Sequence, residues 1–173
     1  SFPTRRSSDL VDLFADADSA FTVEFWGVMD SPNSNCFIGK GTGTEATRIF
    51  SISTTSGGVL RINLRGGTTN VENPSEAYNQ WRHYAITWDG SVAKYYLNGV
   101  FVIDLPVGTA SSTSHNIHFG SLSATSLLLK GKMKEVRIWN IARTQSEIQV
   151  DMNRELVGNE PGLVGYWKIN EGY

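Results

Sequence analysis

The sequence predicts an all-β protein, with two antiparallel sheets packed as a sandwich and one short helix near the C-terminus. Two observations lead to this fold class. Short segments rich in β-branched and aromatic residues recur about every ten residues, and turn-forming residues separate them. A helix start signal occurs late in the chain, between two strand-like segments. This order favours a sandwich over an alternating α/β fold.

The first clear strand pattern spans residues 21–28, where Phe21, Val23 and Phe25 share one face. The polar stretch 30–35 is expected to be a loop, and Gly57-Gly58 marks a tight turn. The stretch from Gly66 to Asn79 is expected to be the longest irregular loop. Three further short strands are predicted in this half of the chain: 36–40, 47–53 and 59–64.

Residues 81–105 predict a three-stranded meander. Tyr84, Ile86 and Trp88 alternate with His83, Ala85 and Thr87, which indicates a half-buried strand. Asp89-Gly90 lies in the first turn and Asn98-Gly99 in the second. Asn-Gly between β-formers is a strong hairpin signal, because a type I′ turn needs positive φ at both central residues.

The C-terminal third predicts two short late strands, 116–119 and 127–129, and a longer one that includes Met133, Val136 and Trp139. Thr144-Gln-Ser-Glu147 then forms a capping box, in which the Thr hydroxyl and the Glu carboxylate satisfy orphan backbone N–H groups. A final strand from Leu163 to Ile169 follows a Pro-Gly turn. Helical spacing groups three acidic residues on a face expected to be solvated, with Arg154 as a partner: Glu147, Asp151 and Glu155.

Two of these segments, the central meander and the C-terminal strand–helix–strand unit, resemble LamG-like domains of the concanavalin A-like lectin/glucanase superfamily. Together they cover roughly half the chain. The resemblance implies a two-sheet antiparallel jelly roll, and it constrains the function only loosely. In that family the motif around Trp167 continues into a further turn and a closing strand, and residues 11–13 resemble the tail of a truncated first strand. The domain is therefore expected to be incomplete at both ends.

The first ten residues are interpreted as a non-native segment. Their back-translation resembles a common sequencing adapter read in one frame, and the alternative is a disordered polar N-terminus. Residues 11–173 are then one domain, a length that buries roughly two-thirds of the unfolded surface.

Composition excludes several function classes. The formal net charge is −2, so there is no basic excess to neutralise phosphates, and nucleic acid is not an expected partner. No apolar run approaches about 18 residues, so no membrane span is expected. The lone Cys36 rules out an intramolecular disulfide and a cysteine-based zinc site, and it is expected to be a buried small residue.

The motifs for catalysis and metal binding are missing, so we predict no enzyme and no cofactor. The resemblance suggests that a glucanase on this fold would carry Glu-x-Asp-x-Glu, which does not occur. Calcium-binding relatives place acids in two rim loops, but the matching segments, 54–58 and 121–126, contain no carboxylate. His115 and His118, three residues apart, do not make a zinc site.

Weak ligand-binding candidates remain. Asp30, Asn33 and Asn35 share one loop, although a turn-forming role is favoured for them. Tyr78, beside Asn79, is the best candidate for an exposed aromatic residue. Packing in the core or at the rim is expected for all five tryptophans: Trp26, Trp81, Trp88, Trp139 and Trp167.

The resemblance implies a non-catalytic recognition or adhesion module, extracellular or at the cell surface, that binds glycan or protein as part of a larger protein. Two alternatives stay open. One is a structural spacer without a ligand of its own, and the other is an accessory domain of a glycosidase or peptidase. Fold alone does not decide between them.

Overall fold

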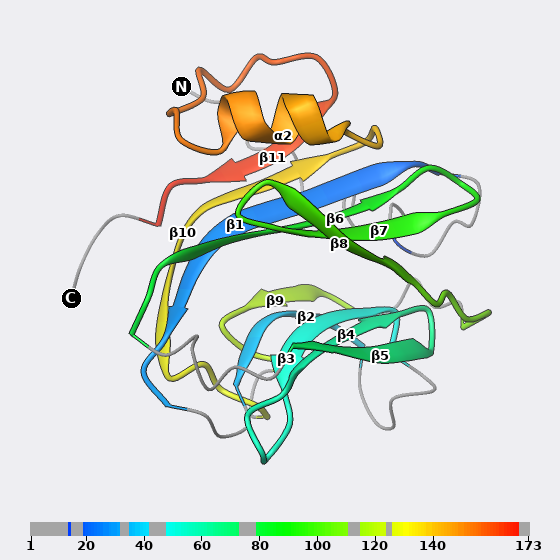
Figure 1. Cartoon of the computed structure of the whole chain (residues 1–173), viewed down its shortest axis with the longest axis vertical. Coiled ribbons are helices and arrows are strands. Elements are labelled where there is room, and N and C mark those ends of the chain that lie inside the picture. Colours follow the sequence, from blue (N-terminus) through cyan, green and yellow to red (C-terminus); the bar gives the residue numbers. More distant parts are fainter. Residues whose placement is uncertain are drawn as a thin grey trace.

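The computed structural model describes Phe14 and residues 19–31, 35–41, 48–72, 79–110, 115–123 and 126–169. These residues form two stacked antiparallel sheets, with a short helix on the outside of one of them (Figure 1). The elements are β1 (Phe21–Met29), β2 (Cys36–Lys40), β3 (Phe50–Thr54), β4 (Leu60–Leu64), β5 (Gly67–Glu72), β6 (Arg82–Trp88), β7 (Ala93–Leu97), β8 (Val100–Leu105), β9 (Ile117–Phe119), β10 (Gly131–Trp139), α2 (Gln145–Asp151) and β11 (Leu163–Trp167).

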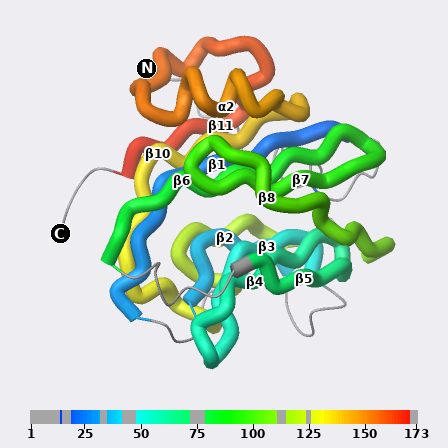
Figure 2. The backbone as a smooth tube through the Cα atoms, in the orientation of Figure 1, coloured from blue at the N-terminus to red at the C-terminus, as the bar shows by residue number. Residues whose placement is uncertain are grey.

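The six-stranded sheet has the order β11-β10-β1-β6-β7-β8, and the five-stranded sheet has the order β5-β4-β3-β2-β9. Strands from opposite ends of the chain are neighbours: β10 lies between β1 and β11 (Figure 2). Thr22 on β1 pairs with Trp139 on β10, and Gly27 pairs with Met133. The all-β sandwich with one C-terminal helix that the sequence predicts is therefore confirmed.

The main core fills the space between the sheets. Phe21, Val23 and Phe25 point into it from β1, as their alternation predicts. Tyr84 stacks on Phe25, with ring centroids 5.2 Å apart. Cys36 is also fully buried, as expected.

A second, smaller core lies on the opposite face of the six-stranded sheet, under α2. Ile148 of the helix packs there against Ala85 and Tyr96. The alternation in β6 indicated a half-buried strand, and this prediction is wrong, because His83 and Thr87 are buried as well. The helix and its flanking segments cover the face that would otherwise meet solvent.

Two local predictions are corrected. The stretch predicted as the longest irregular loop contains β5, which pairs with β4. Arg65 and Gly66 connect these strands, with φ values of 53° and 86°, so an Arg occupies a turn position for which the sequence gives no warning. Residues 127–129 form no strand; Leu127 has a φ of 50°, and the Leu129 N–H bonds to the Gly120 carbonyl without forming a ladder.

The helix begins as predicted. Thr144 accepts a hydrogen bond from the backbone N–H of Glu147, and the Glu147 carboxylate accepts one from the N–H of Thr144. The prediction of a solvated acidic face is wrong for Asp151, which is buried, and Glu155 lies beyond the helix end. Across the described ranges, no helix is both long and apolar enough to cross a membrane.

Candidate functional site

Three of the residues that the sequence singles out for ligand binding, Asp30, Asn35 and Asn79, lie close together at one end of the sandwich. Asn35 is fully buried, and its carboxamide bonds to backbone groups of Ser31 and Lys130. Asp30 and Asn79 are exposed, and the Asn79 N–H bonds to the carbonyl of Met29. These contacts are typical of turns. Asn33 and Tyr78, like residues 1–10, lie outside the described residues.

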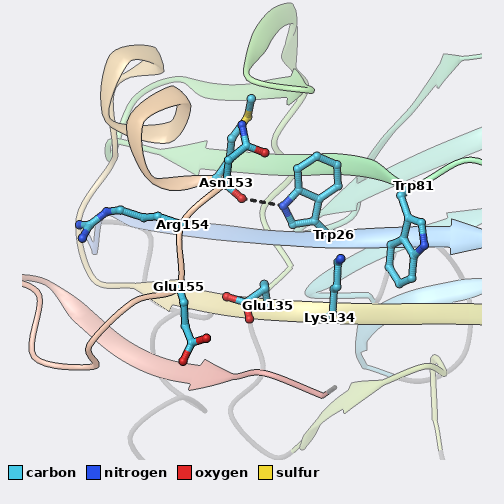
Figure 3. A pocket seen from close by; sticks show the side chains of 8 residues that line it. Trp26, Trp81, Lys134, Glu135, Asn153, Arg154 and Glu155 are labelled. Carbon is cyan, nitrogen blue, oxygen red and sulfur yellow. Dashed lines mark hydrogen bonds between the residues drawn. The ribbon is translucent and has the colours of Figure 1, made fainter. Parts of the chain in front are cut away.

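A different part of the surface carries a hollow of about 500 Å³, beside the end of α2 on the outer face of the six-stranded sheet (Figure 3). Four parts of the chain line it: β1, the residue preceding β6, β10, and the segment after the helix. The lining residues are Trp26, Trp81, Lys134, Glu135, Met152, Asn153, Arg154 and Glu155.

Two indoles form the aromatic part of this hollow. Trp26 is half-buried, and its ring N–H donates to the Met152 carbonyl at 2.7 Å, so the end of the helix fixes its orientation. Trp81 is 41% exposed, and the Lys134 ammonium lies 4.7 Å from its ring centroid. In Figure 3, Lys134 lies between the two tryptophans. Aromatic rings held this way offer flat apolar surface with polar groups beside it.

The floor of the hollow is shaped by a β-bulge. The register of β10 against β1 shifts between the pairs that Glu24 and Trp26 make, so β10 has an extra residue there. Glu135 lies in this bulge with a φ of 54°, a left-handed conformation that is uncommon for residues other than glycine. Such outliers persist where the surrounding structure enforces them, often at functional sites.

The Glu135 carboxylate is held by two donors. Its Oε2 atom accepts hydrogen bonds from Arg137 at 3.0 Å and from the Tyr166 hydroxyl at 2.5 Å. Burial, together with the hydrogen bond to Glu135, raises the pKa of Tyr166 to about 12. The phenol therefore stays protonated and remains a donor at any ordinary working pH.

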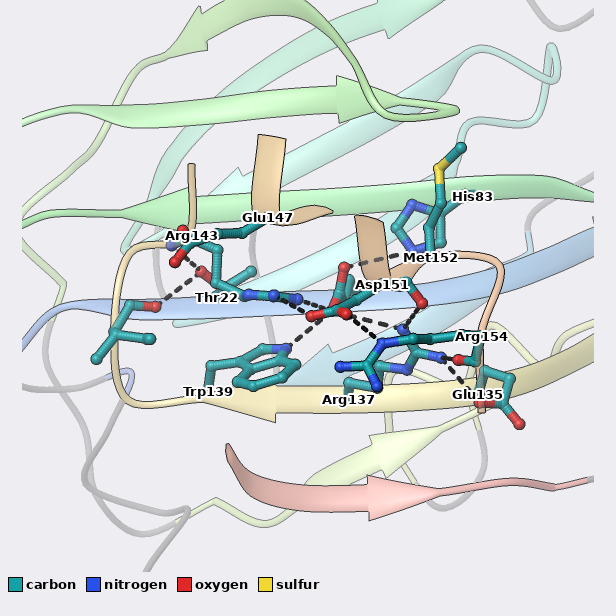
Figure 4. A network of polar contacts seen from close by, with 12 residues as sticks. Thr22, His83, Glu135, Arg137, Trp139, Arg143, Glu147, Asp151, Met152 and Arg154 are labelled. Atoms are coloured by element: carbon teal, nitrogen blue, oxygen red, sulfur yellow. Dashed lines mark hydrogen bonds and ion pairs between the residues drawn. The ribbon is translucent and has the colours of Figure 1, made fainter. Parts of the chain in front are cut away.

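Arg137 connects the floor of the hollow to its wall. This guanidinium is 1% exposed and donates to the carbonyls of Asp151 and Arg154, at 2.7 Å and 2.6 Å. With its bond to Glu135, it joins β10 to the segment that follows α2 (Figure 4). The shape of the hollow thus depends on one buried cation.

A buried polar network continues under the helix (Figure 4). Glu24 accepts hydrogen bonds from Arg143 at 3.0 Å and from the Trp139 indole at 2.9 Å. Arg143 also pairs with Asp151, which in turn pairs with Arg154. Burial raises the pKa of Glu24, while the guanidinium groups of Arg143 and Arg137 oppose that shift.

His83 completes this network as a neutral group. Its Nε2 atom lies 3.5 Å from Glu24 Oε2, and its ring meets Trp26 edge-on at 5.4 Å. Burial lowers the pKa of His83 to about 3, and the nearby charges of Arg137 and Arg143 add to the effect. The network is a structural support under the hollow, since Glu24, His83 and Arg143 are buried.

This arrangement suits binding better than catalysis. Glu24 is fully buried behind ion pairs, so it cannot meet a substrate. Among the described residues, no group of three or more His, Cys, Asp or Glu side chains is arranged to hold a metal ion.

Packing roles were predicted for both tryptophans of the hollow, yet the alternation of residues along their strands indicates which face of the sheet they occupy. Trp26 is out of phase with Phe21, Val23 and Phe25, and Trp81 is in phase with His83. Both therefore belong to the outer face of the sheet. The contributions of Lys134, Glu135 and residues 152–155 had no comparable signal.

Comparison with known proteins agrees with this fold. Residues 6–149 match the family described as the concanavalin A-like lectin/glucanases superfamily. No curated protein is a significant match. A Bacteroides ovatus structure, named as a candidate carbohydrate-binding protein, shares 22% identity with a TM-score of 0.72, covering 97% of this chain and 47% of that one.

Two further structures contain sugars. The CBM40 of a Ruminococcus gnavus IT-sialidase, bound to α2,3-sialyllactose, has 15% identity and a TM-score of 0.60, over 76% of this chain and 81% of that one. The second is domain 4 of AbnA, an extracellular GH43 arabinanase from Geobacillus stearothermophilus, in complex with arabinotriose. It has 17% identity and a TM-score of 0.57, over 77% of this chain and 66% of that one. At these identities the likeness concerns the fold.

Proposed function

Because this chain belongs to the concanavalin A-like lectin/glucanases superfamily, we propose that it is a non-catalytic module that binds glycans in the hollow beside α2. The observation that carries the proposal is the pairing of two indoles with polar side chains around one concave surface. Sugar rings have apolar faces that pack on aromatic rings and hydroxyl groups that need fixed hydrogen-bonding partners. Trp26 and Trp81 provide the aromatic rings, and Glu135 and Asn153 provide the hydrogen-bonding partners.

The module is proposed to act as part of a larger extracellular or cell-surface protein. The chain spans about half of the Bacteroides ovatus structure. Its likeness to one domain of an extracellular arabinanase also supports an accessory role beside other domains. Protein recognition through the same hollow is a less favoured alternative, because the hollow is small compared with a standard protein interface.

A single substitution tests this proposal. Trp81→Ala removes the exposed indole, and we expect it to weaken glycan binding at least about tenfold, equivalent to about 1.4 kcal/mol. The matched control is Phe101→Ala, because Phe101 is an aromatic residue of similar exposure, 44%, on β8 and outside the hollow. Titration calorimetry on glycans found by array screening gives the affinities, and thermal melting checks that both variants fold.

The expected result is lost affinity in Trp81→Ala and wild-type affinity in Phe101→Ala. Equal affinity in the wild type and both variants would show that the glycan binds outside the hollow. Failure of the wild-type protein to bind any glycan on the array would overturn the proposed function.

A further inference from the structure

The charges around the hollow are not equivalent, since three of the four are already paired. Arg154 pairs with Asp151 at 2.5 Å, Glu155 pairs with Lys168, and Glu135 pairs with Arg137. Lys134 lies over the Trp81 ring. Lys134 is therefore the one lining charge without an ion-pair partner among the described residues, and the Glu135 carboxylate follows it directly along the strand.

Glu135 lines the hollow, and its two carboxylate oxygens differ in their hydrogen bonds. Both of its donors, Arg137 and Tyr166, bond to Oε2. No hydrogen bond from the described part of the chain reaches Oε1, and the side chain is 19% exposed. A carboxylate oxygen in this position is a strong acceptor, and hydrogen bonds to charged groups are worth more than neutral ones.

We infer that the hollow selects uncharged glycans, and that Glu135 makes this selection by accepting a hydrogen bond from a sugar hydroxyl. The inference rests on the proposed function and narrows its ligand class. A hydroxyl group donates to Oε1, whereas the carboxylate of a uronic or sialic acid is repelled by it. Like charges brought together in a partly desolvated site oppose binding strongly.

The surroundings of Glu135 make Glu135→Gln an unusually clean test. Arg137 and Tyr166 are both donors, so they will hold the amide oxygen of the new side chain where they now hold Oε2. The amide NH₂ group then faces the hollow, and an acceptor is replaced by a donor with almost no change in shape. We expect neutral oligosaccharides to bind at least about tenfold more weakly, and acidic ones to gain relative to them.

Two control variants separate this effect from a general change in charge. Asp104→Asn makes the same carboxylate-to-amide change on β8, where the side chain is exposed and lies outside the hollow. Lys134→Gln removes the one cation of the hollow that has no carboxylate partner among the described residues. For a neutral ligand, Asp104→Asn should change the affinity by less than about threefold, because exposed charges contribute little. For an acidic ligand, Lys134→Gln should weaken binding, because it removes this ammonium group.

The wild-type protein gives an independent measurement that does not depend on any variant folding. The probes are neutral manno-, cello- and arabino-oligosaccharides, galacturonic acid oligomers and sialyllactose, titrated at 50 mM and 300 mM NaCl. Binding of a neutral glycan should be almost independent of salt, whereas binding of an acidic glycan to Lys134 should weaken as screening increases.

The outcomes distinguish this inference from the proposed function. Tight binding of an acidic glycan that is lost in Lys134→Gln and in Trp81→Ala would overturn the inference and leave the hollow as the glycan site. If Glu135→Gln binds neutral glycans with wild-type affinity, Glu135 is not the residue that selects them. If no probe binds the wild-type protein, both proposals fail together.

Discussion

Arg143 and Glu24 form a buried ion pair between the segment preceding α2 and the first strand of the six-stranded sheet. Arg143 Nη1 lies 3.0 Å from Glu24 Oε1, with the two side chains 6% and 0% exposed. The Arg143 guanidinium also lies over the Trp139 ring, with its Cζ 4.0 Å from the indole centroid. The contact ties the helix to the sheet through charge, while Ile148 ties it through apolar packing.

Breaking this network should destabilise the protein strongly. A buried ion pair adds uncertain net stability, but removing one partner leaves the other charge buried and uncompensated, at a cost of about 3–5 kcal/mol. We expect a loss of this size for Glu24→Gln, measured as the free energy of unfolding in urea. Glu155→Gln, which breaks the exposed pair with Lys168, should cost about 1 kcal/mol or less. Similar losses in both variants would contradict a structural role for Glu24.

His83 should make stability depend on pH. Its pKa falls from 6.5 in the unfolded chain to about 3 in the fold, so between these values the unfolded chain binds one proton more. Stability is therefore fully present above about pH 6.5 and is lost as the pH falls toward 3, with a slope of at most about 1.4 kcal/mol per pH unit. Urea unfolding between pH 6.5 and 5 measures this slope.

The control for this prediction is His83→Gln. Glu24 acts in the opposite sense, because its raised pKa favours proton uptake by the folded state. The quantity to compare is thus the difference in slope between the two proteins. We expect a smaller loss of stability on acidification in the variant, and identical slopes would show that His83 is protonated in the fold.

The two C-terminal tryptophans should differ in their effect on stability. Trp139 is 2% exposed and donates to Glu24, so Trp139→Ala should cost about 3–5 kcal/mol. Trp167 is half-buried and packs on Phe119 at 4.9 Å, toward the main core, and not on the helix. Because Trp167 is less buried than Trp139 and packs against the main core, Trp167→Ala should cost less. A larger drop in melting temperature for Trp167→Ala than for Trp139→Ala would contradict this assignment.

The sequence predicted the elements best where local chemistry dictates the backbone. The Asn98-Gly99 turn has positive φ at both residues, as its hairpin requires, and Thr144 and Glu147 form the capping box that their spacing predicts. Errors arose where local chemistry was ambiguous. Arg65 occupies a left-handed turn position, and residues 127–129 are three apolar leucines that pair with no strand among the described residues.

By itself, the sequence determined the fold class, the phase of the first strand and the start of the helix, because these follow from periodicity and from capping and turn chemistry over a few residues. Only the tertiary structure decided what covers the outer face of the six-stranded sheet. Periodicity shows that Trp26 and Glu24 share a face, but not that one lines a hollow while the other lies buried under α2. The hollow also depends on the bulge at Glu135 and on the wall held by Arg137. Its parts come from four separate segments, and only the packing of the helix against the sheet brings them together.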